Sequence, residues 1–250
     1  RLSHQLGAGA CGAVWLATAL THARPVALKF LLPASPELLA RFRREGQVLA
    51  RVRHPNVLTI FDCDDMDGRP FLVMEHLSGG SLRTKLSPRG LPLERSLGWM
   101  AACLEGLAAC HDAGIVHRDL KPDNIMFGAD ESPRLVDMGL AAMTAEARSL
   151  TRTGMLIGTP RYIPPEVIVG DPGGPPGDVF AMGVTLFEML AGRPPLTETS
   201  LSKLLQAQVT DMPPRLDTLV KVPREVADCV ARALAKLPAA RPASARAFAA

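Results

Sequence analysis

The chain has 250 residues, of which 47% are hydrophobic, enough apolar content for one large folded domain or two smaller ones. Its formal net charge of +3 is too small, and too evenly spread, to favour a nucleic-acid or membrane-surface partner. The five cysteines contain no C-x-x-C pair and lack the density of a secreted disulfide scaffold, so we expect reduced thiols and a cytoplasmic location.

A glycine-rich turn is the first recognisable element. Residues 6–14 read L-G-A-G-A-C-G-A-V, and glycine lets backbone amides approach a phosphate without a Cβ in the way. The same spacing opens a Rossmann dinucleotide unit, but a helix follows there, whereas residues 14–18 are strand-like. The segment therefore predicts a phosphate-binding loop between two strands.

A strand and a helix follow this turn. Residues 25–30 alternate as a strand that carries Lys29, and Ser-Pro-Glu at 35–37 predicts the start of a helix that runs to about residue 52. Glu45 lies on the apolar stripe of that helix, and a carboxylate that faces a core is costly unless it is paired. We therefore expect an ion pair between Glu45 and Lys29.

Two strands and a long helix come next. Residues 57–62 and 70–75 are strand candidates, joined by an acidic turn at 64–68 that lacks the spacing of an EF-hand calcium loop. Residues 92–113 place apolar side chains at helical spacing and are followed by Gly114, which predicts the end of a helix.

The most informative stretch is H-R-D-L-K-P-D-N at residues 117–124. Within one turn-rich loop it supplies a candidate base in Asp119, a cation suited to phosphate in Lys121 and a metal-seeking amide in Asn124. Residues 125–127 then predict a short strand. Residues 134–139, R-L-V-D-M-G, predict a strand and a turn that contains a further carboxylate.

The remainder reads as one long polar segment followed by helices. Residues 140–166 are rich in Ser and Thr and end in G-T-P-R-Y-I-P-P-E, and residues 170–177, dense in Gly and Pro, are expected to form a flexible loop. Residues 178–192 predict an apolar helix, and small helices follow from Pro194. The helix that starts at Pro223 is expected to bury a stripe with these members: Val226, Val230, Ala233, Leu234 and Leu237.

Together these motifs resemble the eukaryotic-type Ser/Thr protein kinases, and the bacterial members of that family most. They are G-x-G-x-x-G-x-V, V-A-L-K, H-R-D-x-K-x-x-N, D-M-G and the P-P-E ending, and they cover the whole chain. The resemblance implies an α+β, bilobal fold with a small antiparallel-sheet N-lobe, one helix named αC in that lobe, and a larger, mainly helical C-lobe. It implies a single domain over 1–250, with the N-lobe at 1–74, the hinge at 75–80 and the C-lobe at 81–250.

The resemblance also implies transfer of the γ-phosphoryl group of Mg-ATP, with Mn²⁺ as an alternative metal, to Ser and Thr hydroxyls of proteins. The implied catalytic residues are Asp119, Lys121, Asn124, Lys29 and Glu45. The implied ATP-binding residues are Leu6, Gly7, Gly9, Gly12, Val14, Ala27, Lys29, Met74, Glu75, Leu77 and Met126. The implied metal ligands are Asn124 and Asp137, and the implied autophosphorylation sites are Thr151 and Thr153.

The same resemblance implies two further contacts. At two positions the sequence departs from the family pattern. Asp178 is expected to tie down the catalytic loop, and Arg241 to pair with Glu166. Met138 stands where the family has phenylalanine, but methionine is apolar and adaptable, so its packing role can survive. Pro164 stands where the family has alanine, in backbone that should tolerate proline.

Two alternatives stay open, a small-molecule phosphotransferase and a pseudokinase that binds without catalysis. The expected partners are ATP and protein substrates, without nucleic acid, and a homodimer that autophosphorylates in trans stays open. No apolar run approaches the roughly 18 to 20 residues that cross a bilayer, so this segment itself should not contact a membrane. The chain starts without methionine, which predicts an excised domain of a longer protein; a membrane anchor elsewhere in that protein stays open.

Overall fold

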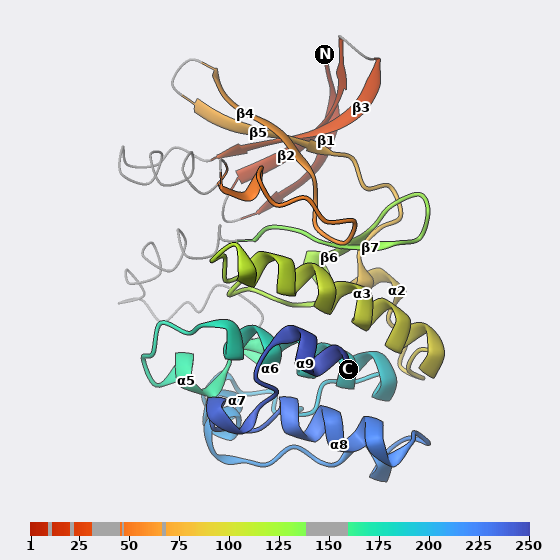
Figure 1. Cartoon of the computed structure of the whole chain (residues 1–250), viewed down its shortest axis with the longest axis vertical. Coiled ribbons are helices and arrows are strands. Elements are labelled where there is room, and N and C mark those ends of the chain that lie inside the picture. The colour runs from red at the N-terminus through yellow and green to blue at the C-terminus, as the bar shows by residue number, and fades with distance from the viewer. Residues whose placement is uncertain (10–11, 21–22, 32–45, 47, 67–68, 139–159) are drawn as a thin grey trace.

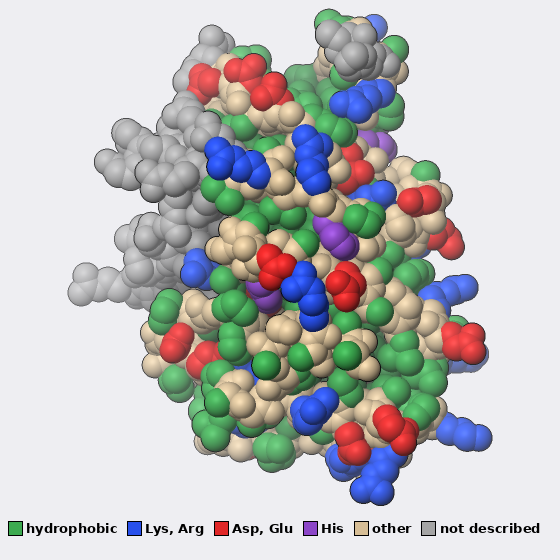
Figure 2. Space-filling view, in the orientation of Figure 1, with side chains coloured by type: hydrophobic (Ala, Val, Ile, Leu, Met, Phe, Trp, Pro, Cys, Tyr) green, Lys and Arg blue, Asp and Glu red, His purple; other side chains and the backbone are tan. Residues whose placement is uncertain are grey.

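The computed structural model of the chain describes residues 1–9, 12–20, 23–31, 46, 48–66, 69–138 and 160–250. Figure 1 shows a small lobe built on a sheet above a larger lobe of helices. The expected α+β arrangement of two lobes is therefore confirmed. In the face drawn in Figure 2, basic and acidic side chains are interspersed, in line with the small net charge.

The small lobe holds a five-stranded antiparallel sheet with strand order β1-β2-β3-β5-β4. The strands are β1 (Leu2–Gly9), β2 (Gly12–Ala19), β3 (Arg24–Leu31), β4 (Ile60–Met66) and β5 (Arg69–Glu75). On β3, Ala27 lies opposite Met74 and Lys29 lies opposite Leu72. Directly opposed residues of an antiparallel pair share a face of the sheet, so these four side chains lie together.

The β4–β5 hairpin corrects two expectations from the sequence. Strand β4 begins at Ile60 and continues to Met66, so residues 64–66 belong to the strand and not to the turn. Asp64 pairs with Phe71 and Asp65 with Pro70, at the edge of the sheet, where charged side chains can point into solvent. Val57, expected to open the strand, instead forms an isolated bridge to Leu135 in the other lobe.

Of the helix expected over residues 35–52, most lies outside the described residues. Residues 46, 48 and 49 are helical, and Leu49 is buried. Gly46 fits closely here, since a Cβ on it would lie 2.9 Å from the side chain of Leu72 on β5. The described end of the helix therefore packs against the sheet.

The large lobe is organised around helix α6 (Pro175–Ala191), whose residues 177–190 are all buried. A helix that is apolar all round is stable only in the middle of a lobe, and here α3 (Leu93–Asp112), α8 (Arg224–Ala233) and α9 (Ala245–Ala249) contact it. The remaining helical segments are α2 (Leu82–Lys85), η1 (Pro122–Asn124), η2 (Pro160–Tyr162), α5 (Pro165–Ile168), α7 (Leu201–Thr210), η3 (Leu216–Thr218) and η4 (Pro238–Ala240). Within the described ranges, no helix is long and apolar enough to span a membrane.

Two expectations about this lobe were wrong. The flexible loop expected over 170–177 ends early, because Pro175 starts α6, and proline is well suited to the first turn of a helix. The stripe expected on the helix after Pro223 does not extend to Leu237, whose side chain is 72% exposed. Helix α8 ends at Ala233, and Leu237 instead precedes the separate turn η4.

A short hairpin joins the two lobes, made of β6 (Ile125–Phe127) and β7 (Pro133–Leu135) (Figure 1). Its first strand bonds the end of the hinge, since the amide of Gly79 donates to the carbonyl of Phe127 at 2.8 Å. Its second strand bonds the small lobe's chain through Leu135, whose carbonyl accepts from the amide of Leu58 at 3.0 Å. The hairpin thus continues the loop at residues 117–124 on one side and contacts both lobes on the other.

Candidate active site

The loop at residues 117–124 is fixed from below by one buried carboxylate. Asp178, in the first turn of α6, is 2% exposed and accepts hydrogen bonds from the amides of His117 at 2.8 Å and Arg118 at 2.9 Å. It also lies 2.8 Å from Nε2 of His111 on α3. The expected tie between Asp178 and the loop is therefore confirmed. It holds Arg118 at a φ of +66°, a left-handed conformation that costs a non-glycine residue about 1 to 2 kcal/mol.

A buried histidine ties the same loop to the strand above it. His117 is fully buried, and its Nε2 lies 2.9 Å from the carbonyl oxygen of Val136, just after β7. Its Nδ1 lies 3.4 Å from the amide nitrogen of Asp119. A carbonyl can only accept and an amide can only donate, so the neutral ring carries its proton on Nε2. The imidazole thus works as a fixed spacer between the loop and the residue before Asp137.

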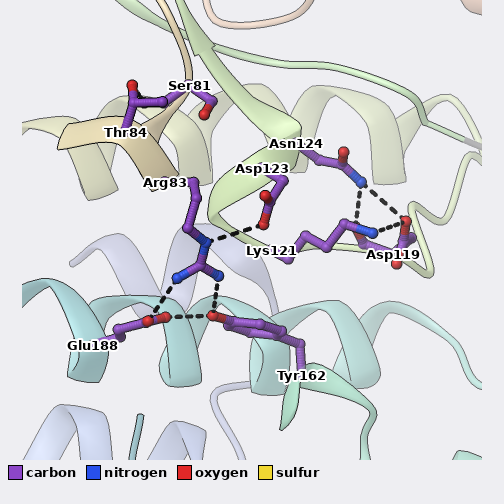
Figure 3. A network of polar contacts seen from close by, with 9 residues as sticks. All are labelled: Ser81, Arg83, Thr84, Asp119, Lys121, Asp123, Asn124, Tyr162 and Glu188. Carbon is purple, nitrogen blue, oxygen red and sulfur yellow. Dashed lines mark hydrogen bonds and ion pairs between the residues drawn. The ribbon is translucent and has the colours of Figure 1, made fainter. Parts of the chain in front are cut away.

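Three polar side chains of the loop converge, as Figure 3 shows. The Oδ2 atom of Asp119 accepts from Nζ of Lys121 at 2.8 Å and from Nδ2 of Asn124 at 3.1 Å. The same amide donates to the carbonyl of Asp119 at 2.7 Å. Because the carboxylate is held by two donors yet is 28% exposed, it can act as an oriented acceptor toward a molecule in solvent.

A second ion pair spans the two lobes. Nζ of Lys29, on β3, lies 2.5 Å from Oδ1 of Asp137, beyond β7. The lysine side chain is only 5% exposed, whereas that of the aspartate is 42% exposed. A buried ammonium needs a counter-charge, and Asp137 supplies one here. Glu45, the partner expected from the sequence, lies outside the described residues, as do Thr151 and Thr153.

The residues expected to bind a nucleotide lie mostly on the small lobe. Gly7 is paired with Val14, and Gly9 with Gly12, at the end of the β1–β2 hairpin, while its tip lies outside the described residues. The face of the sheet that carries Ala27 and Met74 is buried, and so is Leu77 just beyond β5. Met126 is half-buried on β6, and Leu6 is exposed on β1.

The side chain of Glu75 makes structural contacts. Its Oε1 accepts from the amide of Thr59 at 2.8 Å and lies 3.3 Å from Nε of Arg134 on β7. The carboxylate therefore braces the end of β5 against the hairpin. Nucleotide recognition by the backbone of Glu75 stays a prediction.

The two departures from the expected pattern fit the structure. Met138 is buried and lies 3.1 Å, sulfur to sulfur, from Cys110 on α3, so methionine fills the apolar position. It lines a small cavity together with Met74, Asp137 and four aliphatic side chains of the small lobe. Pro164 sits at the N-cap of α5 with φ of −64°, the angle to which its ring is restricted.

The expected pair between Glu166 and Arg241 is confirmed. The two nitrogens Nη1 and Nη2 of Arg241 donate to the two carboxylate oxygens at 2.8 and 2.7 Å. Nε of the arginine also donates to the carbonyl of Ala235 at 2.8 Å. The arginine side chain has no exposed surface, so the pair fastens the segment before α6 to the end of the chain.

Sequence reasoning missed one cluster beside the loop. Arg83 on α2 contacts Asp123 of the loop, Glu188 of α6 and Tyr162 of η2 (Figure 3). Glu188 offered a signal, because it is the acidic residue in the apolar run from 179 to 191 and a buried acid requires a partner. Nothing in the sequence identified Arg83 as that partner.

The side chains of Asn124 and Asp137 are suited to bind a divalent metal. The amide of Val136 donates to the carbonyl of Asn124 at 3.0 Å, which brings Asn124 beside the strand that leads to Asp137. Asn124 directs its amide nitrogen to Asp119, so its side-chain oxygen is left for a cation, and the Asp137 carboxylate is exposed. Among the residues described, no group of three or more His, Cys, Asp or Glu could hold a metal alone. Two oxygen ligands therefore suit a metal that takes its remaining ligands from phosphate and water.

Comparisons with known proteins agree with this geometry. A family model described as protein kinase domain matches residues 1–250. Serine/threonine-protein kinase PknL of Mycobacterium tuberculosis is 39% identical over 228 residues, which cover 89% of this chain and 57% of that protein. Serine/threonine-protein kinase Pkn1 of Myxococcus xanthus is 35% identical over 258 residues, which cover 99% of this chain and 37% of that protein. The chain thus spans only part of the length of the curated relatives it matches.

Proposed function

Because the chain belongs to the protein kinase family, we propose that it transfers the γ-phosphoryl group of ATP to Ser and Thr hydroxyls of proteins. The observation that carries the proposal is the Asp119 carboxylate, which is held by Lys121 and Asn124 and remains partly exposed. A carboxylate fixed in this way accepts the proton of a substrate hydroxyl, while the neighbouring lysine stabilises the phosphoryl group.

ATP binding is assigned to the sheet, the hinge and the β6–β7 hairpin. The glycine-rich end of β1 and β2 offers backbone amides to the phosphates, and the buried Lys29 offers its ammonium to the α- and β-phosphates. The adenine is assigned to the apolar faces of Ala27, Met74 and Met126, with backbone groups of the hinge at its edge. Leu6, Val14 and Leu77 complete the apolar enclosure.

Protein kinases use ATP with a divalent metal, and we assign magnesium, with manganese as an alternative, to Asn124 and Asp137. The bound metal supplies positive charge to the β- and γ-phosphates as the phosphoryl group is transferred. The contact between Lys29 and Asp137 supports this assignment, because it brings the phosphate-binding cation and the metal-binding carboxylate to one point between the lobes. Glu45 stays the proposed second partner of Lys29.

The domain limits and the regulation of the kinase are further parts of the proposal. We assign one catalytic domain to 1–250, with the hinge at 75–80. Thr151 and Thr153 are proposed autophosphorylation sites, modified in trans within a homodimer. Arg118 supports a phosphate switch, because it is exposed next to Asp119 and its backbone is fixed by Asp178.

Two other functions are less well supported. A pseudokinase would lack part of the catalytic set, whereas Lys29, Asp119, Asn124 and Asp137 are all present with their polar contacts. A small-molecule phosphotransferase is disfavoured, because the relatives reported above are named serine/threonine-protein kinases.

The experiment compares the wild type with Asp119→Asn, which keeps the shape of the side chain but removes the base. Phosphate transfer from Mg-ATP to a Ser/Thr protein substrate should fall by about 10²- to 10⁴-fold, the usual worth of a positioned acid–base group. The thermal shift given by Mg-ATP should persist. Asp228→Asn, at an exposed carboxylate on α8, is the matched control and should keep wild-type turnover. Wild-type turnover in Asp119→Asn contradicts the assignment.

A further inference from the structure

A buried glutamine of helix α7 holds the backbone of a neighbouring segment. Gln208 is 1% exposed, and an amide this deeply buried costs free energy unless it is hydrogen-bonded. Its Nε2 donates to the carbonyl of Arg161 at 3.0 Å and to that of Ile163 at 2.9 Å. Carbonyl oxygens only accept, so the amide nitrogen must face them. We use the name held segment for residues 161–163, whose backbone one side chain fixes on both sides of Tyr162.

Gln208 is in turn fixed from behind. Helix α7 lies against η2 and beside α5 (Figure 1), and its last turn is bonded by Lys236, from the chain between α8 and η4. The lysine Nζ donates to the carbonyl of Gln208 at 2.8 Å, which suits the negative end of a helix. The carbonyl of Lys236 accepts from Nη2 of Arg241 at 3.1 Å, and this arginine also binds Glu166. The chain that leads into α5 is therefore anchored at two points.

The held segment forms part of the surface beside the catalytic loop. The side chains of Arg161 and Ile163 are half-buried, so each still reaches solvent. The hydroxyl of Tyr162, between them, accepts from Arg83 at 2.6 Å, and Arg83 contacts Asp123 of the loop. A protein chain that presents a hydroxyl to the catalytic aspartate therefore lies next to the held segment.

The supports of the held segment and of the catalytic base are separate. The backbone of the catalytic loop is fixed by Asp178 of α6 and by the ring of His117. Among the hydrogen bonds of the described residues, none joins Gln208 to the loop at 117–124. A change at Gln208 therefore acts first on the held segment and leaves Asp119 in its place.

We propose that Gln208 is a positioning residue for the protein substrate, because it keeps the held segment in the conformation that binds the substrate chain. The inference rests on the proposed kinase function. Without the amide, the carbonyls of Arg161 and Ile163 lose their donor, and the segment populates other conformations. The apparent affinity for the substrate then falls by the fraction of molecules that remain competent to bind it. Phosphoryl transfer within the bound complex keeps its rate.

The experiment uses Gln208→Met, which keeps an unbranched side chain of similar length but has no N–H donor. Steady-state phosphate transfer is measured with a peptide that the wild type phosphorylates, selected from a library of Ser- and Thr-containing peptides. KM for the peptide should rise about tenfold, the order expected from the loss of two neutral hydrogen bonds. The value of kcat and KM for ATP should stay near those of the wild type. Gln206→Met, at an exposed glutamine of the same helix, is the matched control and should keep the wild-type KM for the peptide.

A second variant tests the support from behind. Lys236→Met should raise KM for the peptide by a smaller factor than Gln208→Met, since its ammonium acts only through the backbone of Gln208. Residues in one network are not additive, so the double variant should resemble Gln208→Met alone. A double variant whose KM rises by the product of the two single factors would show that Lys236 acts independently, and would contradict this part of the inference.

The outcomes separate this inference from the proposed function. If the wild type phosphorylates neither peptides nor proteins, the kinase function itself is contradicted. If the wild type is active but a folded Gln208→Met keeps its KM for the peptide, the inference is wrong. It is also wrong if kcat falls and KM for ATP rises together, because Gln208 then supports the lobe as a whole. Should Gln208→Met fail to fold, Lys236→Met decides the question, and an unchanged KM for the peptide contradicts the inference.

Discussion

Replacing Asp178 by asparagine tests whether one buried carboxylate sets the geometry of the catalytic loop. Asparagine keeps the shape of the side chain but turns one acceptor oxygen into an NH₂ donor. It can orient so that only the amide of Arg118 loses its acceptor. One buried, unsatisfied donor costs about 1 to 3 kcal/mol of unfolding free energy. For a chain of this size that corresponds to a fall of about 2 to 12 °C in Tm.

The effect on catalysis should exceed the effect on stability. The bond to Asp178 holds Arg118 at φ of +66°, and Asp119 is the next residue. Once that bond is lost, Arg118 can relax to a more favourable conformation and move the base. A shift of about 1 Å at a catalytic group lowers the rate by roughly 10²-fold. We therefore expect kcat to fall about 10²-fold, with KM for ATP nearly unchanged, because the nucleotide is assigned to other elements.

The assays are urea unfolding followed by circular dichroism, and steady-state phosphate transfer at a temperature where both proteins are folded. Asp112→Asn is the matched control, since that carboxylate on α3 is 59% exposed and pairs with Arg246 at the surface. An exposed pair contributes about 0 to 1 kcal/mol, so this variant should show little change in either assay. A folded Asp178→Asn with wild-type kcat would refute the reasoning that links the carboxylate to the loop.

Four further variants extend the test. Asp137→Ala should abolish metal-dependent nucleotide binding and turnover together, and an unchanged magnesium dependence in thermal-shift titrations would place the metal elsewhere. Arg241→Ala should lower the unfolding free energy by about 3 to 5 kcal/mol, since it leaves a largely buried carboxylate unpaired; a loss below 1 kcal/mol in urea would contradict this. Burial, with the charge of a nearby carboxylate, raises the pKa of Cys110 to about 12, so the unfolded thiol ionises first and stability should fall as pH rises from about 9 to 12. Cys110→Ala should show a smaller fall in urea titrations at those pH values. Thr151→Ala combined with Thr153→Ala should be less active than the autophosphorylated wild type; full activity, or no phosphate on either threonine by mass spectrometry, would exclude the switch.

Local sequence patterns and family motifs correctly predict the positions of elements that depend on residues close in sequence. The catalytic loop, the strand before Asp137 and the helix from 93 to 112 were placed within a residue or two. The pair of Glu166 with Arg241 was also expected, although 75 residues separate them, because each belongs to a recognisable motif. A contact between residues far apart in the sequence is therefore predictable only where both residues belong to a recognisable motif.

The errors arose where a residue type has two readings. The sequence around Pro175 predicts a loop, yet proline favours the first turn of a helix as much as it disfavours the interior. Asp64 and Asp65 predict a turn, yet an edge strand also accommodates charged side chains. The contact of Arg83 with Glu188 joins residues 105 apart that share no motif, so packing of the lobe alone reveals it.

The bonds between Thr59 and Glu75 determine how the two lobes can move. Thr59 directly follows the segment of the small lobe that bonds β7, and Glu75 is the last residue of β5. The amide of Glu75 donates to the carbonyl of Thr59 at 3.0 Å, and the amide of Thr59 donates to the Glu75 carboxylate. Two rigid bodies that are connected along one edge in this way rotate about a hinge axis at that edge. We therefore expect a rotation of the lobes to leave the Thr59–Glu75 bonds intact and to displace the glycine-rich end of β1 and β2 more than the residues beside these bonds.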